Sequence, residues 1–151
     1  MKRTVIVAVL AVVIGITGWT ATHLAAQAAS AGRTAAQLLR ADAVQWVTAR
    51  TGQEMRVLWG DPRTGPYGRF NKFAAGFQDR PHVHTRDLRA VIISGTLVVQ
   101  VADQSPVELP AGSYALIPGG APHTHSCQGD TACVLFVEQD GPNDTTPVQA
   151  R

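Results

Sequence analysis

The sequence predicts an all-β fold, a single small barrel or sandwich of antiparallel strands preceded by a short N-terminal helix or arm. Short apolar runs recur between residues 54 and 138, and turn-forming residues separate them at close intervals. The chain shows neither an internal repeat nor a linker that would divide it into two domains. Such strands favour a closed antiparallel architecture whose interior can hold one ligand or metal ion.

The segments along the chain differ in composition. Residues 29–50 form an arm or a helix, because residues 36–49 place their leucine, alanine and valine residues near helical spacing. Residues 51–140 form the β domain, with a glycine- and proline-rich loop at residues 60–68, and the polar residues 141–151 form a tail. We expect strands at residues 54–59, 69–75, 88–94, 96–102, 107–109, 113–118, 122–127 and 132–138.

The N-terminus has the pattern of a secretory signal. Lys2 and Arg3 precede an apolar run over residues 4–19, and Ala26-Gln27-Ala28 resembles a cleavage site. We expect residues 1–28 to be a signal peptide and the mature protein to be periplasmic or secreted. An uncleaved membrane anchor is the alternative, because the run can be extended to about 20 residues. Without residues 1–28, the chain has 11 basic and 11 acidic residues, and its basic residues are scattered, which argues against nucleic-acid binding.

The two cysteines are close in sequence. Cys127 and Cys133 flank a short turn between two apolar segments. In an oxidising compartment they are expected to form a disulfide. The alternative is a thiolate metal ligand at Cys127, four residues after His123.

The four histidines that follow the predicted signal peptide form two His-x-His pairs, His82 with His84 and His123 with His125. Residues two apart in an extended strand project from the same face, so each pair can direct both imidazoles at one ion. Because the mature chain has no other histidine, we expect these four to form a site.

These residues resemble the cupin superfamily of jelly rolls, also called double-stranded β-helices, which carries two motifs. The first motif, G-x5-H-x-H-x3or4-E-x6-G, matches at Gly76, His82, His84 and Gly95. The second, G-x5-P-x-G-x2-H-x3-N, matches at Gly112, Pro118, Gly120 and His123. Residues 57–62, 72–77 and 87–96 look like uncharacterised exported cupins related to the cupin half of ChrR-type anti-sigma factors. The resemblance implies a cupin-type, RmlC-like barrel with a metal site, and homodimers that pair through residues 38–59.

The chain departs from the first motif at the metal-binding glutamate, which falls on Leu88 or Arg89. We expect His125 to replace it, because His125 has the parity of His123. Asp87, which needs a bulge to turn inward, and water are the alternatives. Imidazole ligands suit one divalent transition metal, namely Zn, Fe, Mn, Ni or Cu.

Three classes of function remain open. The first is a metal-dependent enzyme, oxygenase-like, that acts on a small organic substrate in a pocket lined by Leu88, Phe73 and Tyr114. The second is a non-catalytic cupin that binds or senses a small ligand through its metal. The third is a metal-free isomerase with a histidine base, which fits less well because no carboxylate is placed to orient the base.

Overall fold

The computed structural model describes residues 36–148 of the 151-residue chain. Residues 36–40 have no regular secondary structure, and a compact unit begins at Ala41. The predicted signal peptide and the start of the predicted arm lie outside the described residues. Between residues 36 and 148, no helix is long and apolar enough to cross a membrane.

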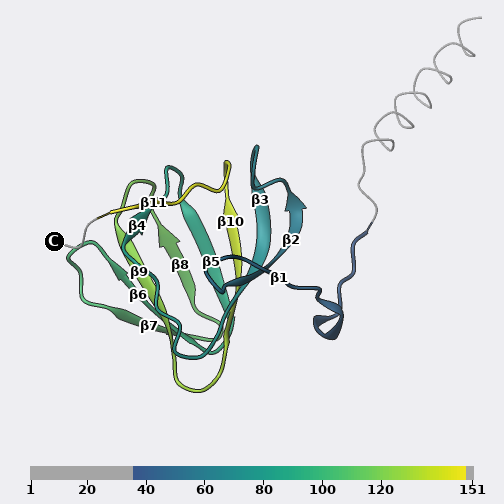
Figure 1. Ribbon diagram of the computed structural model, residues 1–151, viewed down its shortest axis with the longest axis horizontal. Helices are drawn as coiled ribbons and strands as arrows, with labels where there is room; N and C mark the ends of the chain where they lie inside the picture. The colour runs from purple at the N-terminus through teal and green to yellow at the C-terminus, as the bar shows by residue number, and fades with distance from the viewer. Residues whose placement is uncertain (1–35, 149–151) are drawn as a thin grey trace, which may run out of the picture. The chain divides into compact units, whose positions relative to one another are not determined.

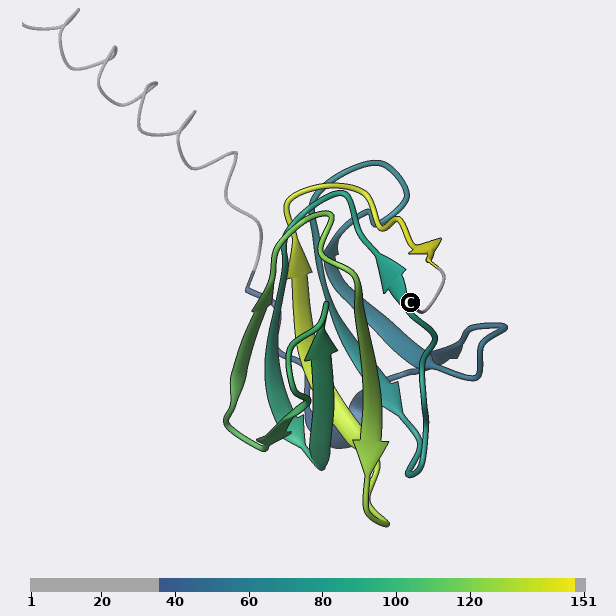
Figure 2. The ribbon, with the colours of Figure 1, turned by 90° about the vertical axis from the view of Figure 1, so that its left-hand side faces the viewer.

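Two antiparallel sheets make up the unit (Figures 1 and 2). One sheet has the strand order β1-β2-β3-β10-β5-β8 and the other β11-β4-β9-β6-β7. This layout fits a jelly roll, so the all-β part of the predicted fold class is confirmed. The strands are β1 (Val47–Thr48), β2 (Glu54–Gly60), β3 (Tyr67–Phe73), β4 (His82–Val83), β5 (Leu88–Ser94), β6 (Thr96–Val101), β7 (Val107–Pro110), β8 (Tyr114–Ile117), β9 (His123–Gln128), β10 (Cys133–Gln139) and β11 (Thr146–Pro147).

The core lies between the two sheets and follows the two-residue period of the strands. On β5, Ala90 and Ile92 are buried while Val91 and Ile93 are exposed. The neighbouring strand β10 buries every second residue from Cys133 to Gln139. Each fully buried aliphatic side chain contributes about 1.5–3 kcal/mol relative to an exposed one, so this alternation fixes which face of each strand is internal.

The predicted N-terminal helix is not found in the described part of the chain. Ala41–Ala43 form a single 3-10 turn, and Val47–Thr48 form the edge strand β1. In β1, Val47 pairs with Met55 of β2. Of the two predictions for this segment, the extended arm agrees with the structure and the helix does not. Backbone pairing to an available sheet edge outweighs a weak helical pattern.

The expectation of a polar tail from residue 141 also needs correction. Thr146 and Pro147 form β11 and pair with Val83 and His82. The strand is at the edge of its sheet, the position in which a proline without a backbone N–H is tolerated. Residues 141–148, which we call the C-terminal segment, are therefore part of the fold.

The structure contains the predicted disulfide between Cys127 of β9 and Cys133 of β10. Both residues are buried, and the bond joins strands that belong to different sheets. Because the thiolate of Cys127 is consumed by this bond, Cys127 is not a metal ligand in this structure.

Thiol titration of the unreduced, unfolded protein is expected to find no free thiol in the mature chain. Reduction should lower the free energy of unfolding by only about 2 kcal/mol, because the bond closes a loop between residues six apart. Denaturant titrations with and without reductant measure this difference. Two free thiols in the unreduced protein would contradict the disulfide.

Candidate metal centre

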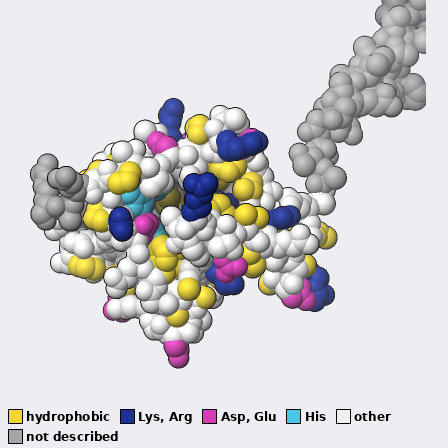
Figure 3. All heavy atoms as spheres, in the orientation of Figure 1, with side chains coloured by type: hydrophobic (Ala, Val, Ile, Leu, Met, Phe, Trp, Pro, Cys, Tyr) yellow, Lys and Arg dark blue, Asp and Glu magenta, His cyan; other side chains and the backbone are white. Residues whose placement is uncertain are grey.

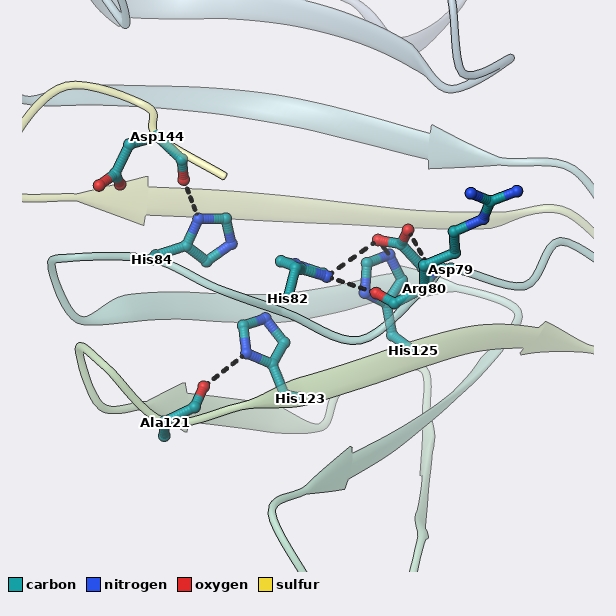
Figure 4. A network of polar contacts seen from close by, with 8 residues as sticks. All are labelled: Asp79, Arg80, His82, His84, Ala121, His123, His125 and Asp144. Atoms are coloured by element: carbon teal, nitrogen blue, oxygen red, sulfur yellow. Dashed lines mark hydrogen bonds and ion pairs between the residues drawn. The ribbon is translucent and has the colours of Figure 1, made fainter. Parts of the chain in front are cut away.

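Three histidines meet between strands β4 and β9. His82 begins β4 and pairs directly with His123, which begins β9, and His84 follows one residue after β4 ends. All three side chains are buried, and each offers a ring nitrogen within 4.8 Å of those offered by the other two. Figure 4 shows the three imidazoles pointing toward one another. The structure thus brings together one predicted pair and the first member of the other.

The turn before β9 fixes His123 relative to His84. Gly120 has a positive φ of 78°, a backbone conformation that glycine adopts without strain. Its N–H donates to the backbone carbonyl of His84 at 2.7 Å. This turn lies at the second motif of the sequence, and it holds the two histidine-bearing segments side by side.

Each of the three imidazoles is oriented by a backbone carbonyl. The Nδ1 atom of His82 donates to the carbonyl of Arg80 at 2.8 Å, and that of His123 donates to Ala121 at 3.0 Å. His84 donates from Nδ1 to the carbonyl of Asp144. A carbonyl oxygen only accepts hydrogen bonds, so Nδ1 carries the proton in all three rings and Nε2 keeps its lone pair. Three lone pairs held in this way fit a divalent transition metal.

The site also favours the neutral form that metal binding requires. Burial lowers the pKa of His123 to about 4, although its hydrogen bond to Ala121 opposes the shift. Burial lowers the pKa of His84 as well. Both rings are therefore neutral at pH 7, and a metal ion would not have to displace protons from them.

His125 lies outside this group of three. It forms a second group with Asp79 and His82, in which its Nε2 is 3.6 Å from the Asp79 carboxylate. That nitrogen is buried and has no hydrogen-bond partner in the described structure. The His125 ring stacks on Phe77 with a centroid separation of 5.8 Å, and burial lowers its pKa to about 4. His125 is thus a neutral imidazole beside the three-histidine group, facing Asp79.

Asp87, the carboxylate considered as a fourth ligand, makes its contacts outside the three-histidine group. Asp87 accepts a hydrogen bond from the backbone N–H of Gly119 at 2.9 Å, and its carboxylate lies 3.8 Å from Arg89. It does not line the cavity beside the histidines, whereas Leu88 does. The position implied for the glutamate therefore presents an apolar side chain to the site.

A cavity of about 280 Å³ adjoins the histidines. Figure 3 shows histidine atoms within a depression of the molecular surface, so the site is reached from outside. Leu88 and Phe73 line the cavity as expected, but Tyr114 does not and is 58% exposed. The expectation for Tyr114 was wrong because Ala115 and Ile117 are the inward-facing residues of β8.

Sequence reasoning missed several polar residues of this site. Arg69 and Asn71 of β3 line the cavity, and their parity with the core residue Phe73 was the available signal. The C-terminal segment contributes Asn143 and Thr145 to the lining. Asp144 accepts from the backbone N–H of Thr85 as well as from His84, and no pattern in the sequence of that segment predicts this.

Solved structures similar to this fold are cupins. The polyketide cyclase RemF from Streptomyces resistomycificus matches with a TM-score of 0.65 and 17% identity, over 78% of this chain and 88% of RemF. A cupin-2 domain protein of Rhodospirillum rubrum, Rru_A2000, matches with a TM-score of 0.62 and 14% identity, over 78% and 83%. An RmlC-like cupin from Shewanella frigidimarina matches with a TM-score of 0.58 and 17% identity, over 72% and 93%. At these identities the likeness establishes the fold alone.

The protein thus shares the jelly-roll fold of these cupins. The chain belongs to the family described as "Domain of unknown function (DUF4437)", whose model matches residues 29–150. No curated protein matches the sequence.

Proposed function

We propose that this protein is an exported metal-binding cupin that acts as a metal-dependent enzyme, oxygenase-like, on a small organic substrate. The observation that carries the proposal is the set of three buried imidazoles whose Nδ1 atoms are all committed to backbone carbonyls. His82, His84 and His123 would hold the ion through Nε2. An Fe(II) ion bound there with open positions would supply activation of dioxygen.

The chain's own residues would prepare the reaction. The carbonyls of Arg80, Ala121 and Asp144 hold the three rings in place, so the ligand set needs little rearrangement on binding. The apolar side chains of the cavity, among them Leu88 and Phe73, exclude water from a bound substrate. RemF, which has a similar fold, is a polyketide cyclase, so this architecture is compatible with catalysis.

The test is elemental analysis of the mature protein purified without chelator, followed by oxygen uptake with a panel of small organic compounds. One equivalent of iron and substrate-dependent oxygen consumption would support the oxygenase. Bound metal with tight ligand binding but no turnover would favour the non-catalytic alternative. Absence of metal from protein reconstituted with Zn, Fe, Mn, Ni and Cu would overturn the proposal.

Export is part of this proposal and is supported by the buried disulfide, which forms in oxidising compartments. Protein recovered from the cell envelope is expected to begin near Ala29 and to be released without detergent. N-terminal sequencing of the released protein checks this, and an intact Met1 in the membrane pellet would indicate an anchor. The closer kinship with exported cupins of the ChrR-related type and a homodimer through residues 38–59 also stay predictions.

A further inference from the structure

Arg69 is a buried cation without an anionic partner. Its side chain is 7% exposed and lines the cavity from the middle of β3. Within residues 36–148, no carboxylate lies within the 4.0 Å of an ion pair, and its Nε has no hydrogen-bond partner. Guanidinium remains charged at any physiological pH, so this charge cannot be removed by deprotonation.

The neighbours of Arg69 do not compensate for its burial. One guanidinium nitrogen lies 3.9 Å from the sulfur of Met55, which is a weak acceptor. The carbon at the centre of the guanidinium lies 5.1 Å from the centroid of the Tyr67 ring, a cation–π contact. Burial lowers the pKa of Arg69, which shows that its surroundings disfavour the cation. A buried charge that its own fold leaves unpaired is costly unless a ligand supplies the counter-charge.

Asn71 adds a second unsatisfied polar group on the same face. It lies two residues after Arg69 on β3, it is 5% exposed, and it lines the same cavity. Its Oδ1 has no hydrogen-bond partner in the described structure. Two polar groups more than nine-tenths buried, each with an atom that lacks a partner and both facing one cavity, are the expected arrangement for a polar end of a ligand.

Much of the remaining wall of the cavity is apolar, although Thr51, Gln53, Asp79, Asn143 and Thr145 also line it. Leu135 and Val137 come from β10, which pairs with β3, and Leu88 and Ala90 come from β5, the next strand beyond β10 in the sheet. The three histidines line the cavity as well. A ligand that fills this space would need one charged end, an apolar body and a size compatible with about 280 Å³. These requirements describe a small organic carboxylate better than an inorganic anion, which has no apolar part to bury.

We propose that Arg69 and Asn71 form a carboxylate subsite and that the substrate class of this protein is a small, largely apolar carboxylic acid. The planar guanidinium can bind both oxygens of a carboxylate. Asn71 would donate a hydrogen bond to the carboxylate through its Nδ2 amide group, whereas its Oδ1, which only accepts, would face another part of the ligand. The proposal rests on the proposed function only where it places the reacting end of the acid at the three-histidine group. The subsite itself consists of residues of this chain and does not require the metal.

The test is binding of sodium isobutyrate to the purified protein, followed as the shift in melting temperature at constant ionic strength. Isobutyramide, which has nearly the same shape without the charge, is the neutral control. Isobutyrate at ten times its Kd is expected to raise the melting temperature by about 3 °C or more, with saturation, and isobutyramide should not. Arg69→Met should weaken isobutyrate binding by at least about 30-fold, whereas Arg69→Lys should retain part of it.

Arg56→Met is the matched control variant. Arg56 is a strand arginine on β2 whose Nε also lacks a partner, but it does not line the cavity, so its loss should leave isobutyrate binding unchanged. Circular dichroism confirms the fold of each variant, and metal content is measured in parallel. Unchanged binding in Arg69→Met, equal binding of isobutyramide, or equal stabilisation by inorganic phosphate would each overturn the carboxylate subsite. Carboxylate binding by protein that takes up no metal would support the subsite while refuting the proposed function.

Discussion

Replacement of His84 or His123 by alanine is expected to empty the metal centre. Each supplies one of three lone pairs that the fold has already oriented, and no carboxylate among the described residues stands in the group to replace it. The affinity for zinc should fall by more than about 100-fold. Metal that binds only the folded state stabilises it, so at 100 times the wild-type Kd the variants should lack most of the about 2.7 kcal/mol of stabilisation that the wild type gains. Metal analysis and melting curves with and without zinc measure both effects.

His125→Ala and Asp87→Ala are the matched controls for this experiment. His125 groups with Asp79 rather than with all three ligands, and Asp87 holds the Gly119 amide outside the cavity. Both variants should keep most of the zinc affinity. If His125→Ala loses as much zinc affinity as His84→Ala, the result would support the four-histidine site expected from the sequence. The same loss in Asp87→Ala would show that the carboxylate turns inward to bind the ion.

The metal-free protein is expected to lose stability steeply as the pH falls from about 6.5 to about 4. Burial lowers the pKa of His123 and of His125 to about 4 in the folded state, below the ordinary value of 6.5. The unfolded chain therefore binds more protons in this window, and protons favour unfolding. Each histidine shifted in this way accounts for a loss on the order of 3 kcal/mol, completed at the folded-state pKa. Denaturant titrations at intervals between pH 7 and pH 4.5 measure the slope.

Two comparisons separate this effect from general acid denaturation. The variant His123→Gln removes one titrating group and should show a shallower slope over the same window. Saturating zinc should displace the His123 part of the loss to lower pH, because protons must then compete with the ion for that ring, whereas the His125 part should remain. A stability that is flat between pH 7 and pH 4.5 in the metal-free wild type would contradict the lowered pKa values.

The longer strands of the fold could be predicted from the sequence because their pattern is local. Alternating apolar residues mark β5 and β10, and glycines with positive φ, such as Gly95 and Gly120, mark the turns. Parity within each His-x-His pair is local as well. These features depend on residues that are neighbours in the chain, whereas the convergence of His82 and His84 with His123 was implied by the resemblance to the cupin motifs.

The features that were missed depend on partners distant in sequence. Strands β1, β4 and β11 have two residues each, and each exists only because a sheet edge is available to pair with it. The role of Asp144 in orienting His84 is carried by a backbone carbonyl, which any residue possesses, so no residue type signals it. Phe73 was expected to line the pocket, and its parity with Arg69 and Asn71 on β3 would have indicated the polar end of the cavity.

The hydrogen bond between His84 and Asp144 also determines when the centre can form. The two residues are 60 positions apart, and Asp144 is synthesised after all three histidines of the centre. A polypeptide that is still emerging from the ribosome, or threading unfolded through a membrane, has its other histidines but not the carbonyl that orients His84. The fully oriented centre therefore forms only once Asp144 has arrived in the same compartment as the histidines. For an exported protein, the ions available at the destination, rather than those of the cytosol, would then decide which metal is taken up.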